Sequence, residues 1–204
     1  MSSPEQDPVY EVMKNQSGRK ADNHTVQNLT YENVGIKETS KDKETIIEHD
    51  SMNEIQITSC DPEKCHERHI RYNVTMEQIV ALIQRSSECR QYIKYRCIGS
   101  ILFEGGGYTQ SATWLSRDGS HMKYWEGATS RRNFYCACGE TESCVDSNKK
   151  CNCDSNSRDT ETSDEGFLTD KDTLPVTGLQ FGDAGDAGEY GWHTLGPLVC
   201  TGRN

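Results

Sequence analysis

The chain has 204 residues, ten cysteines, a formal charge of −10 and only 33% hydrophobic residues. A high and even cysteine count indicates a disulfide-rich secreted or cell-surface domain, because the cytosol would leave thiols reduced or bound to metal. The negative charge argues against nucleic acid or an anionic membrane as the main partner.

Residues 1–59 contain no Cys, Trp or Phe and are dominated by polar and charged residues. Because this segment has too little apolar surface to offset the entropy of ordering, we predict a disordered acidic tail. Two tyrosines in it, Tyr10 and Tyr31, are each followed three positions later by an apolar residue. Once phosphorylated, they would fit Src-homology-2 proteins, although two solvated tyrosines are the simpler interpretation.

The start of the chain lacks the basic flank and apolar core of a signal peptide, and the longest apolar run, residues 79–83, is too short to span a bilayer. Three N-x-S/T sequons lie in the tail, and a fourth is at Asn73, which we expect to be glycosylated. Phosphorylation and glycosylation of the tail imply opposite sides of a membrane. We expect an extracellular or cell-surface location. One hypothesis is a type II membrane protein whose membrane segment, near residues 50–60, is missing from this chain.

Residues 60–88 form the next predicted part, a cysteine pair followed by a helix. Cys60 and Cys65 are expected to pair with each other or to crosslink chains. Thr75 and Gln78 have the form of a capping box, which predicts a helix that continues to about residue 87. Its apolar face is expected to pack on the domain or on a sister chain, so a homo-oligomer is possible.

After Cys89 the sequence changes to short strand-like segments separated by turns. Two of them, residues 111–115 and 121–125, flank an Asp-Gly pair, which is favoured in tight turns and predicts a hairpin. Alternation places its tryptophans, Trp114 and Trp125, in the core. Short strands, many turns and one preceding helix are typical of an irregular, disulfide-rich α+β domain.

A polar stretch, residues 136–153, holds five cysteines as two C-x-C pairs around a central cysteine. Alternate Cα atoms of a strand lie roughly 6.6 Å apart, near the upper limit for a disulfide, so each C-x-C is expected to reach two separate partners. Eight cysteines allow 105 pairings, and the sequence does not choose among them. The expected bridges of the domain at residues 89–204 use Cys89, Cys97, Cys136, Cys138, Cys144, Cys151, Cys153 and Cys200.

The ordered motifs CRQYIKYRC, WLSRDGSHMKYW, CACG, CNCD, DEGFLTDKDTLPV and GPLVC resemble the fibrinogen-like module of the contactin-associated and neurexin-IV proteins, over residues 89–202. This resemblance implies a fibrinogen C-terminal-like fold and a noncatalytic extracellular role in recognition or cell adhesion. The ligand would be a protein or a glycan at the cell surface. The discoidin, laminin-G and epidermal-growth-factor-like domains that accompany the module in that family are absent from this sequence.

Three alternatives remain. In a calcium-dependent lectin the oxygen ligands would come from Asp154, Asn156, Asp159 and Asp164 or from Asp183, Asp186 and Glu189, although neither spacing is that of a calcium loop. In an intracellular zinc-binding signalling adaptor the cysteines would be ligands, but their spacings are not those of zinc knuckles. An enzyme would need a base among the six histidines (His24, His49, His66, His69, His121 and His193), but no catalytic motif accompanies them. We therefore predict that the protein is not an enzyme and carries no cofactor.

Overall fold

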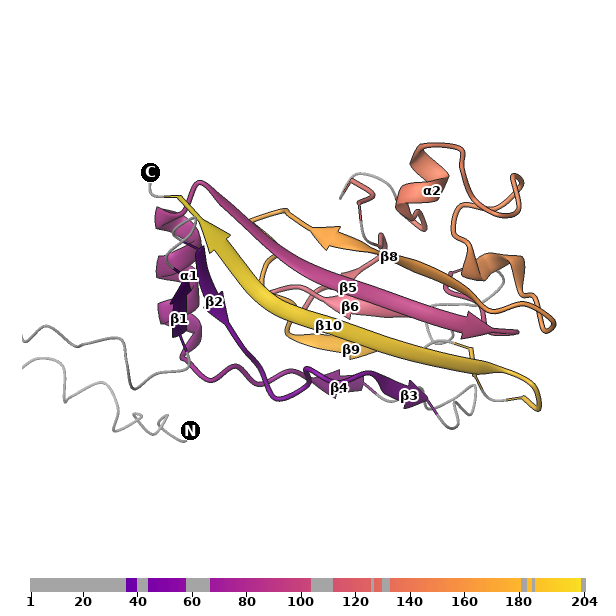
Figure 1. The fold of residues 1–204 in the computed structure, drawn as a ribbon, viewed down its shortest axis with the longest axis horizontal. Coiled ribbons are helices and arrows are strands. Elements are labelled where there is room, and N and C mark those ends of the chain that lie inside the picture. Colours follow the sequence, from indigo (N-terminus) through magenta and orange to yellow (C-terminus); the bar gives the residue numbers. More distant parts are fainter. Residues whose placement is uncertain are drawn as a thin grey trace, which may run out of the picture. The chain divides into compact units, whose positions relative to one another are not determined.

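The structure, a computed structural model, describes residues 36–39, 44–57, 67–103, 112–125, 127–129, 133–180, 183–184 and 186–202. They fall within the unit formed by residues 31–204. This unit contains two antiparallel sheets and one longer helix, drawn in Figure 1. Side chains from both sheets and from the helix form one apolar core.

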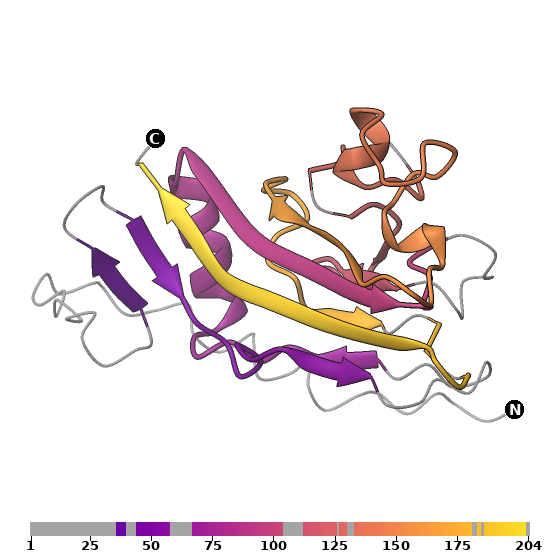
Figure 2. The same ribbon diagram turned by 45° about the vertical axis from the view of Figure 1, so that its right-hand side comes forward.

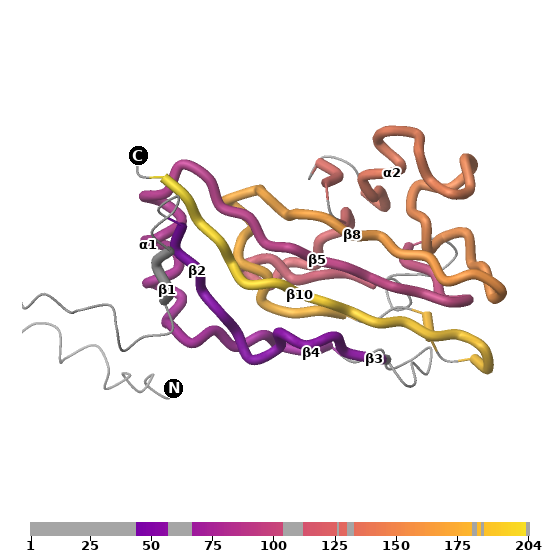
Figure 3. Tube along the Cα trace, in the orientation of Figure 1, coloured from indigo at the N-terminus to yellow at the C-terminus, as the bar shows by residue number. Residues whose placement is uncertain are grey.

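The larger sheet has six strands in the order β1-β2-β10-β5-β8, with β3 also paired to β10. The two long strands β5 and β10 form its centre, and a bulge between Leu195 and Leu198 interrupts their register. Figure 3 shows β10 between β2 and β5. The strands are β1 (Ile36–Thr39), β2 (Glu44–Ile47), β3 (Ile55–Ile57), β5 (Glu88–Ile98), β8 (Thr162–Leu168) and β10 (Tyr190–Thr201).

The smaller sheet contains four short strands in the order β4-β9-β6-β7. The predicted hairpin is confirmed, because β6 pairs with β7 across a turn in which Gly119 has a φ of +81°. A positive φ is the reason that glycine suits this turn. The strands are β4 (Glu67–His69), β6 (Thr113–Leu115), β7 (His121–Met122) and β9 (Gly178–Gln180), and the short helices are α2 (Ala137–Glu140) and η3 (Cys153–Ser155).

Helix α1 (Met76–Arg85) lies near the C-terminal end of β10 (Figures 1 and 2). The predicted capping box is present, because Thr75 accepts a hydrogen bond from the Gln78 N–H and the Gln78 side chain accepts one from the Thr75 N–H. The helix buries Ile79, Leu82 and Ile83 in the core, so it packs on its own domain.

The core lies between the two sheets and includes side chains from both. Trp114 and Trp125 are completely shielded from water, as alternation predicted, and Tyr95 packs edge-on against Trp125 with their ring centroids 6.3 Å apart. The indole N–H groups donate to the carbonyl oxygens of Tyr124 and Asp164. The described residues are therefore mostly β, with few helices and four disulfides.

Residues 36–39, which pair with β2, and residues 44–57 correct one prediction. The sequence placed them in the disordered tail, but β2 and β3 pair with β10, and Ile47 lies opposite Leu198 with 1% of its surface exposed. The composition of the whole tail concealed this short apolar segment, which is ordered because a long neighbouring strand supplies its hydrogen bonds.

Candidate recognition surface

Strand β5 presents different side chains to its two faces, because successive residues of a strand point to opposite sides. One set faces the core and the other lies half-buried or exposed on the outer side of the six-stranded sheet. The buried set is Cys89, Gln91, Ile93, Tyr95 and Cys97, and the outer set includes Arg90, Tyr92, Lys94 and Arg96.

The two neighbours of β5 add aromatic rings to the same outer side. Trp192 of β10 lies opposite Arg96, and Phe167 of β8 lies opposite Tyr92. Tyr190 and Phe167 remain 44% and 48% exposed. We call this surface the arginine–aromatic face, and its residues are Arg90, Tyr92, Arg96, Phe167, Tyr190 and Trp192.

One end of the arginine–aromatic face is built around Arg96. Its guanidinium carbon lies 3.9 Å from the centroid of the Trp192 ring, and the Tyr190 ring stacks on Trp192 with centroids 6.0 Å apart. Glu54 and Glu161 each accept a hydrogen bond of 2.8 Å from this guanidinium, and the bond to Glu54 is the main reason that the pKa of Arg96 is raised. The cation is therefore held in one orientation over the indole.

The other end is built around Phe167. The Tyr92 ring packs edge-on against it with centroids 5.6 Å apart, and the Arg90 guanidinium lies 5.5 Å from the Phe167 centroid. Arg90 also pairs with Glu44 of β2 at 2.9 Å. The Tyr92 hydroxyl donates to Glu165, which lowers the pKa of that carboxyl group. Strands far apart in sequence thus fix each ring and each guanidinium.

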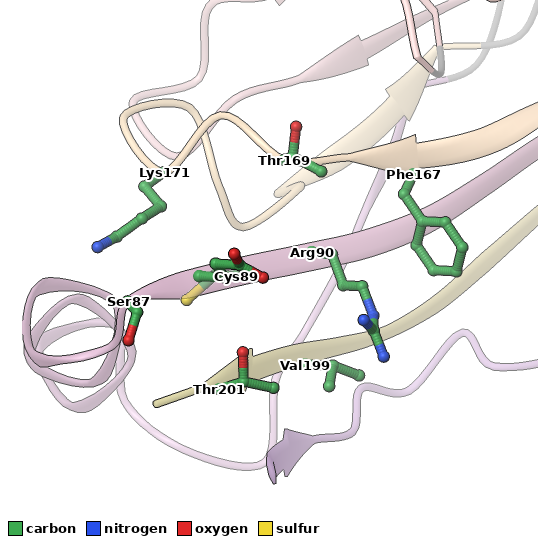
Figure 4. A pocket seen from close by; sticks show the side chains of 9 residues that line it. Ser87, Cys89, Arg90, Phe167, Thr169, Lys171, Val199 and Thr201 are labelled. Atoms are coloured by element: carbon green, nitrogen blue, oxygen red, sulfur yellow. The ribbon is translucent and has the colours of Figure 1, made fainter. Parts of the chain in front are cut away.

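A groove of about 520 Å³ continues from this end and shares Arg90 and Phe167 with the face. Figure 4 shows Lys171 and Ser87 at the opposite end of the groove from Phe167. Cys89 lines the groove, and a disulfide joins it to Cys200, the directly opposed residue of β10. The groove is therefore lined by the cationic side chains of Arg90 and Lys171 and by the apolar ring of Phe167. A disulfide holds its Cys89 side in place.

The structure pairs the eight cysteines of the predicted domain in four disulfides. Neither C-x-C closes on itself, as the spacing predicted. Cys60 and Cys65 lie outside the described residues. The bridges are Cys89–Cys200, Cys97–Cys153, Cys136–Cys151 and Cys138–Cys144. Three of them involve residues 136–155, which we call the cysteine knob.

The zinc alternative finds no support among the described residues. Cys136, Cys151 and Asp164 are close enough for their donor atoms to lie within 4.8 Å of one another. The two sulfur atoms are bonded to each other, however, so neither is a thiolate that could bind zinc. The other six described cysteines are also paired.

Two of the proposed calcium ligands, Asp154 and Asp164, instead accept hydrogen bonds from backbone N–H groups. One carboxylate oxygen of Asp154 accepts hydrogen bonds from the N–H groups of Leu102 and Phe103, at 3.0 and 2.8 Å. Asp164 accepts from the N–H groups of Asn152 and Cys153, at 2.8 and 2.9 Å. Burial raises the pKa of Asp164 to about 6, against the opposing effect of these two hydrogen bonds.

The other proposed calcium ligands lie in exposed or engaged positions. Asn156 and Asp159 are exposed. Glu189 accepts a hydrogen bond from the Asp186 N–H and pairs with Arg158 at 3.2 Å. Burial raises the pKa of Asp183. Calcium binding stays a prediction.

The histidines of the described part contribute in different ways. His193 is completely buried against Tyr95 and Trp125, and this burial lowers its pKa to about 3. His49 is buried and lies 3.0 Å from the carbonyl oxygen of Gly196. His69 and His121 are exposed, whereas His24 and His66 lie outside the described residues.

Asn73 is exposed immediately before helix α1, a position that a glycosylating enzyme could reach. Tyr10 and Tyr31 lie outside the described residues. Among the residues that the structure describes, no helix is long and apolar enough to cross a membrane.

The arginine–aromatic face is not predicted from the sequence. Short strand-like segments are predicted after Cys89, but the sequence assigns no role to the outward side chains of this stretch. The alternation of Tyr92, Lys94 and Arg96 with buried residues was the available signal. The partners Phe167 and Trp192 could not be assigned, because they depend on the register of β5 with β8 and β10.

Comparison with known proteins supplies the remaining finding. No family model matches the chain. It is 37% identical over 166 residues to neurexin-4 of Drosophila melanogaster, and the match covers 78% of this chain. The chain spans only 13% of the length of that relative. The match confirms the predicted resemblance to the fibrinogen-like module of the neurexin-IV and contactin-associated family.

Proposed function

We propose that this domain is a non-enzymatic recognition module that binds a protein ligand at the cell surface through its arginine–aromatic face. The observation that carries the proposal is the row of paired rings and guanidinium groups on the outer side of β8, β5 and β10. Aromatic residues and arginine are enriched at protein interfaces and dominate their binding energy.

The geometry also favours binding because the face is already ordered. Arg96 is held by Glu54 and Glu161, and Arg90 is held by Glu44. A side chain that is fixed before association loses less conformational entropy when a partner binds. A protein ligand fits the face better than a small molecule, because a broad sheet surface with exposed rings matches the size of a protein interface.

The similarity to neurexin-4 supports a role in cell adhesion and an extracellular location. From the same similarity we infer that the domain has a fibrinogen-like fold. Docking of Src-homology-2 proteins to Tyr10 and Tyr31, the type II orientation, glycosylation at Asn73 and homo-oligomer formation stay predictions. Calcium-dependent sugar binding is also still a prediction.

The face can be tested by truncating its two most exposed rings. The chain would be secreted as a disulfide-bonded protein, and its binding to cultured cells would be measured by flow cytometry. Tyr190→Ala combined with Phe167→Ala should weaken binding by about tenfold or more, as expected for interface anchors.

Val145→Ala is the matched control, because Val145 is 74% exposed and lies in the cysteine knob. This variant should bind like the wild type. An unchanged affinity of the double variant, or an equal loss in the control, would contradict the assignment of the face. Thermal unfolding of all three proteins would establish that each is folded.

A further inference from the structure

A second cavity lies beside the cysteine knob, away from the arginine–aromatic face. It has a volume of about 380 Å³ and is lined by Asn133, Phe134, Tyr135, Asn148, Lys149 and Lys150. Phe103 and Asp154 complete its lining. The volume lies at the small end of the range for ligand pockets, which suits one or two sugar rings.

Phe134 forms an aromatic wall of this cavity. Phe134 is 41% exposed, and its ring packs edge-on against the ring of the buried Phe103, with centroids 5.7 Å apart. The backbone of Phe134 has a φ of +63°, which is costly for a large side chain. Its N–H donates to the carbonyl oxygen of Lys123, so a hydrogen bond maintains this conformation. An exposed ring held in an unfavourable backbone conformation suggests a use for the ring at that place.

Cations surround the rings. The Lys123 ammonium lies 5.9 Å from the Phe134 centroid, and the Lys150 ammonium lies 5.4 Å from the Tyr135 centroid. The Lys150 carbonyl oxygen accepts a hydrogen bond of 3.0 Å from the Cys136 N–H, and a Cβ at Gly139 would lie 2.4 Å from the same oxygen. The cavity is therefore a cationic site in a chain whose formal charge is −10.

Asp154 is the acidic group in the lining. One of its carboxylate oxygens accepts hydrogen bonds from the N–H groups of Leu102 and Phe103, so backbone dipoles offset its charge. The two amides, Asn133 and Asn148, carry both donors and acceptors and can pair with hydroxyl groups.

We propose that this cavity binds an acidic sugar residue, one that carries a carboxylate or sulfate group, without calcium. The apolar side of the sugar ring stacks on Phe134, its hydroxyls pair with Asn133 and Asn148, and its anionic group pairs with Lys150. The two disulfides within the knob hold these groups in place before the ligand arrives. The site is independent of the protein-binding face.

The proposal can be tested by titrating the secreted full chain with 3′-sialyllactose, sulfated lactose and lactose in the presence of EDTA, followed by isothermal calorimetry. At least one acidic sugar should bind about tenfold or more tightly than lactose, because only the acidic sugars can form an ion pair with the Lys150 ammonium. Equal binding of all three sugars in EDTA would overturn the proposal. So would the absence of binding in EDTA, whether or not binding returns when calcium is added.

Two variants separate ligand binding from folding. Lys150→Gln should weaken the preferred acidic sugar about tenfold or more and leave lactose unchanged. Phe134→Gly should lose binding while it still unfolds cooperatively, because glycine adopts a positive φ at little cost and this offsets part of the lost contact with Phe103. Arg85→Gln, an exposed cation in the last turn of helix α1, is the control and should bind normally. Wild-type affinity in Lys150→Gln would overturn the assignment.

Discussion

In the two sheets, Ile93, Trp114 and Leu195 have at most 1% of their surface exposed, whereas the cysteine knob buries little besides its sulfur atoms. Its other buried residues are only Gly139 and Asp154. A buried large apolar side chain contributes about 2 kcal/mol, and the sheets contain many of them. The knob must depend on loop closure instead, so one domain combines two sources of order.

The junction between these regions uses both covalent and polar links. The Cys97–Cys153 disulfide joins β5 to the knob. Asp164 of β8 accepts hydrogen bonds from Asn152 and Cys153 on the knob side. Because these links are specific, the knob keeps a defined position on the sheet without an apolar interface of its own.

The largest expected effect is the loss of the longest disulfide loop. Cys89→Ala with Cys200→Ala opens a loop with a sequence separation of 111 and should lower the free energy of unfolding by about 5 kcal/mol. Alanine is preferred to serine because both cysteines are buried. Urea denaturation followed by tryptophan fluorescence would measure the loss.

The matching change in the knob should cost less. Cys138→Ala with Cys144→Ala opens a loop with a separation of only 6 and should lower the free energy of unfolding by about 2 kcal/mol. The same urea experiment applies. If this variant lost as much stability as the variant without Cys89–Cys200, loop length would not explain how the two regions differ.

Local sequence signals were sufficient for some of the fold. The capping box of Thr75, the Asp-Gly turn and the burial of Trp114 and Trp125 each depend on residues close together in the chain. The prediction that the two cysteines of each C-x-C pair do not bond to each other also depended only on local geometry.

Long-range pairings could not be predicted in the same way. Residues 44–47 have only two apolar side chains within a polar stretch, and their pairing with β10 on one side and β1 on the other orders them. The four disulfides are one choice among many, because loop closure does not specify partners. The arginine–aromatic face requires the register of three strands, in which a shift of one residue would move Trp192 to the core side.

Acid should affect the two regions in opposite directions. Burial in the sheet core lowers the pKa of His193 from 6.5 to about 3. The free energy of unfolding therefore decreases as pH falls from 6.5 towards 3, because the unfolded chain binds a proton that the folded chain does not. Burial at the knob junction raises the pKa of Asp164 from 3.8 to about 6, so stability is gained as pH falls from 6 towards 3.8.

His193→Phe separates these effects, because phenylalanine keeps an aromatic ring against Tyr95 and Trp125 but does not titrate. Between pH 8 and pH 5 the wild type should lose about 2 kcal/mol relative to this variant. The contribution of Asp164 cancels in the difference, and in the variant it should appear as a gain in stability on acidification. Urea denaturation at both pH values measures this, and parallel pH profiles would contradict the assignment to His193.

The smallest expected effect tests whether helix α1 belongs to the region stabilised by burial. Thr75→Ala removes the cap and should lower the free energy of unfolding by about 1 kcal/mol, whereas Thr75→Ser should keep most of it. Because Thr75 is also part of the sequon, Asn73→Gln is the control for lost glycosylation, and all variants would be compared without glycan.

Tryptophan fluorescence would follow the unfolding of the sheets in the Thr75 variants, because Trp114 and Trp125 lie in the core of the sheets. If α1 unfolds together with the sheets, losing its cap must shift their transition, since Ile79 and Leu82 share that core. A loss of helical circular dichroism without a shift in fluorescence would instead show that α1 unfolds separately.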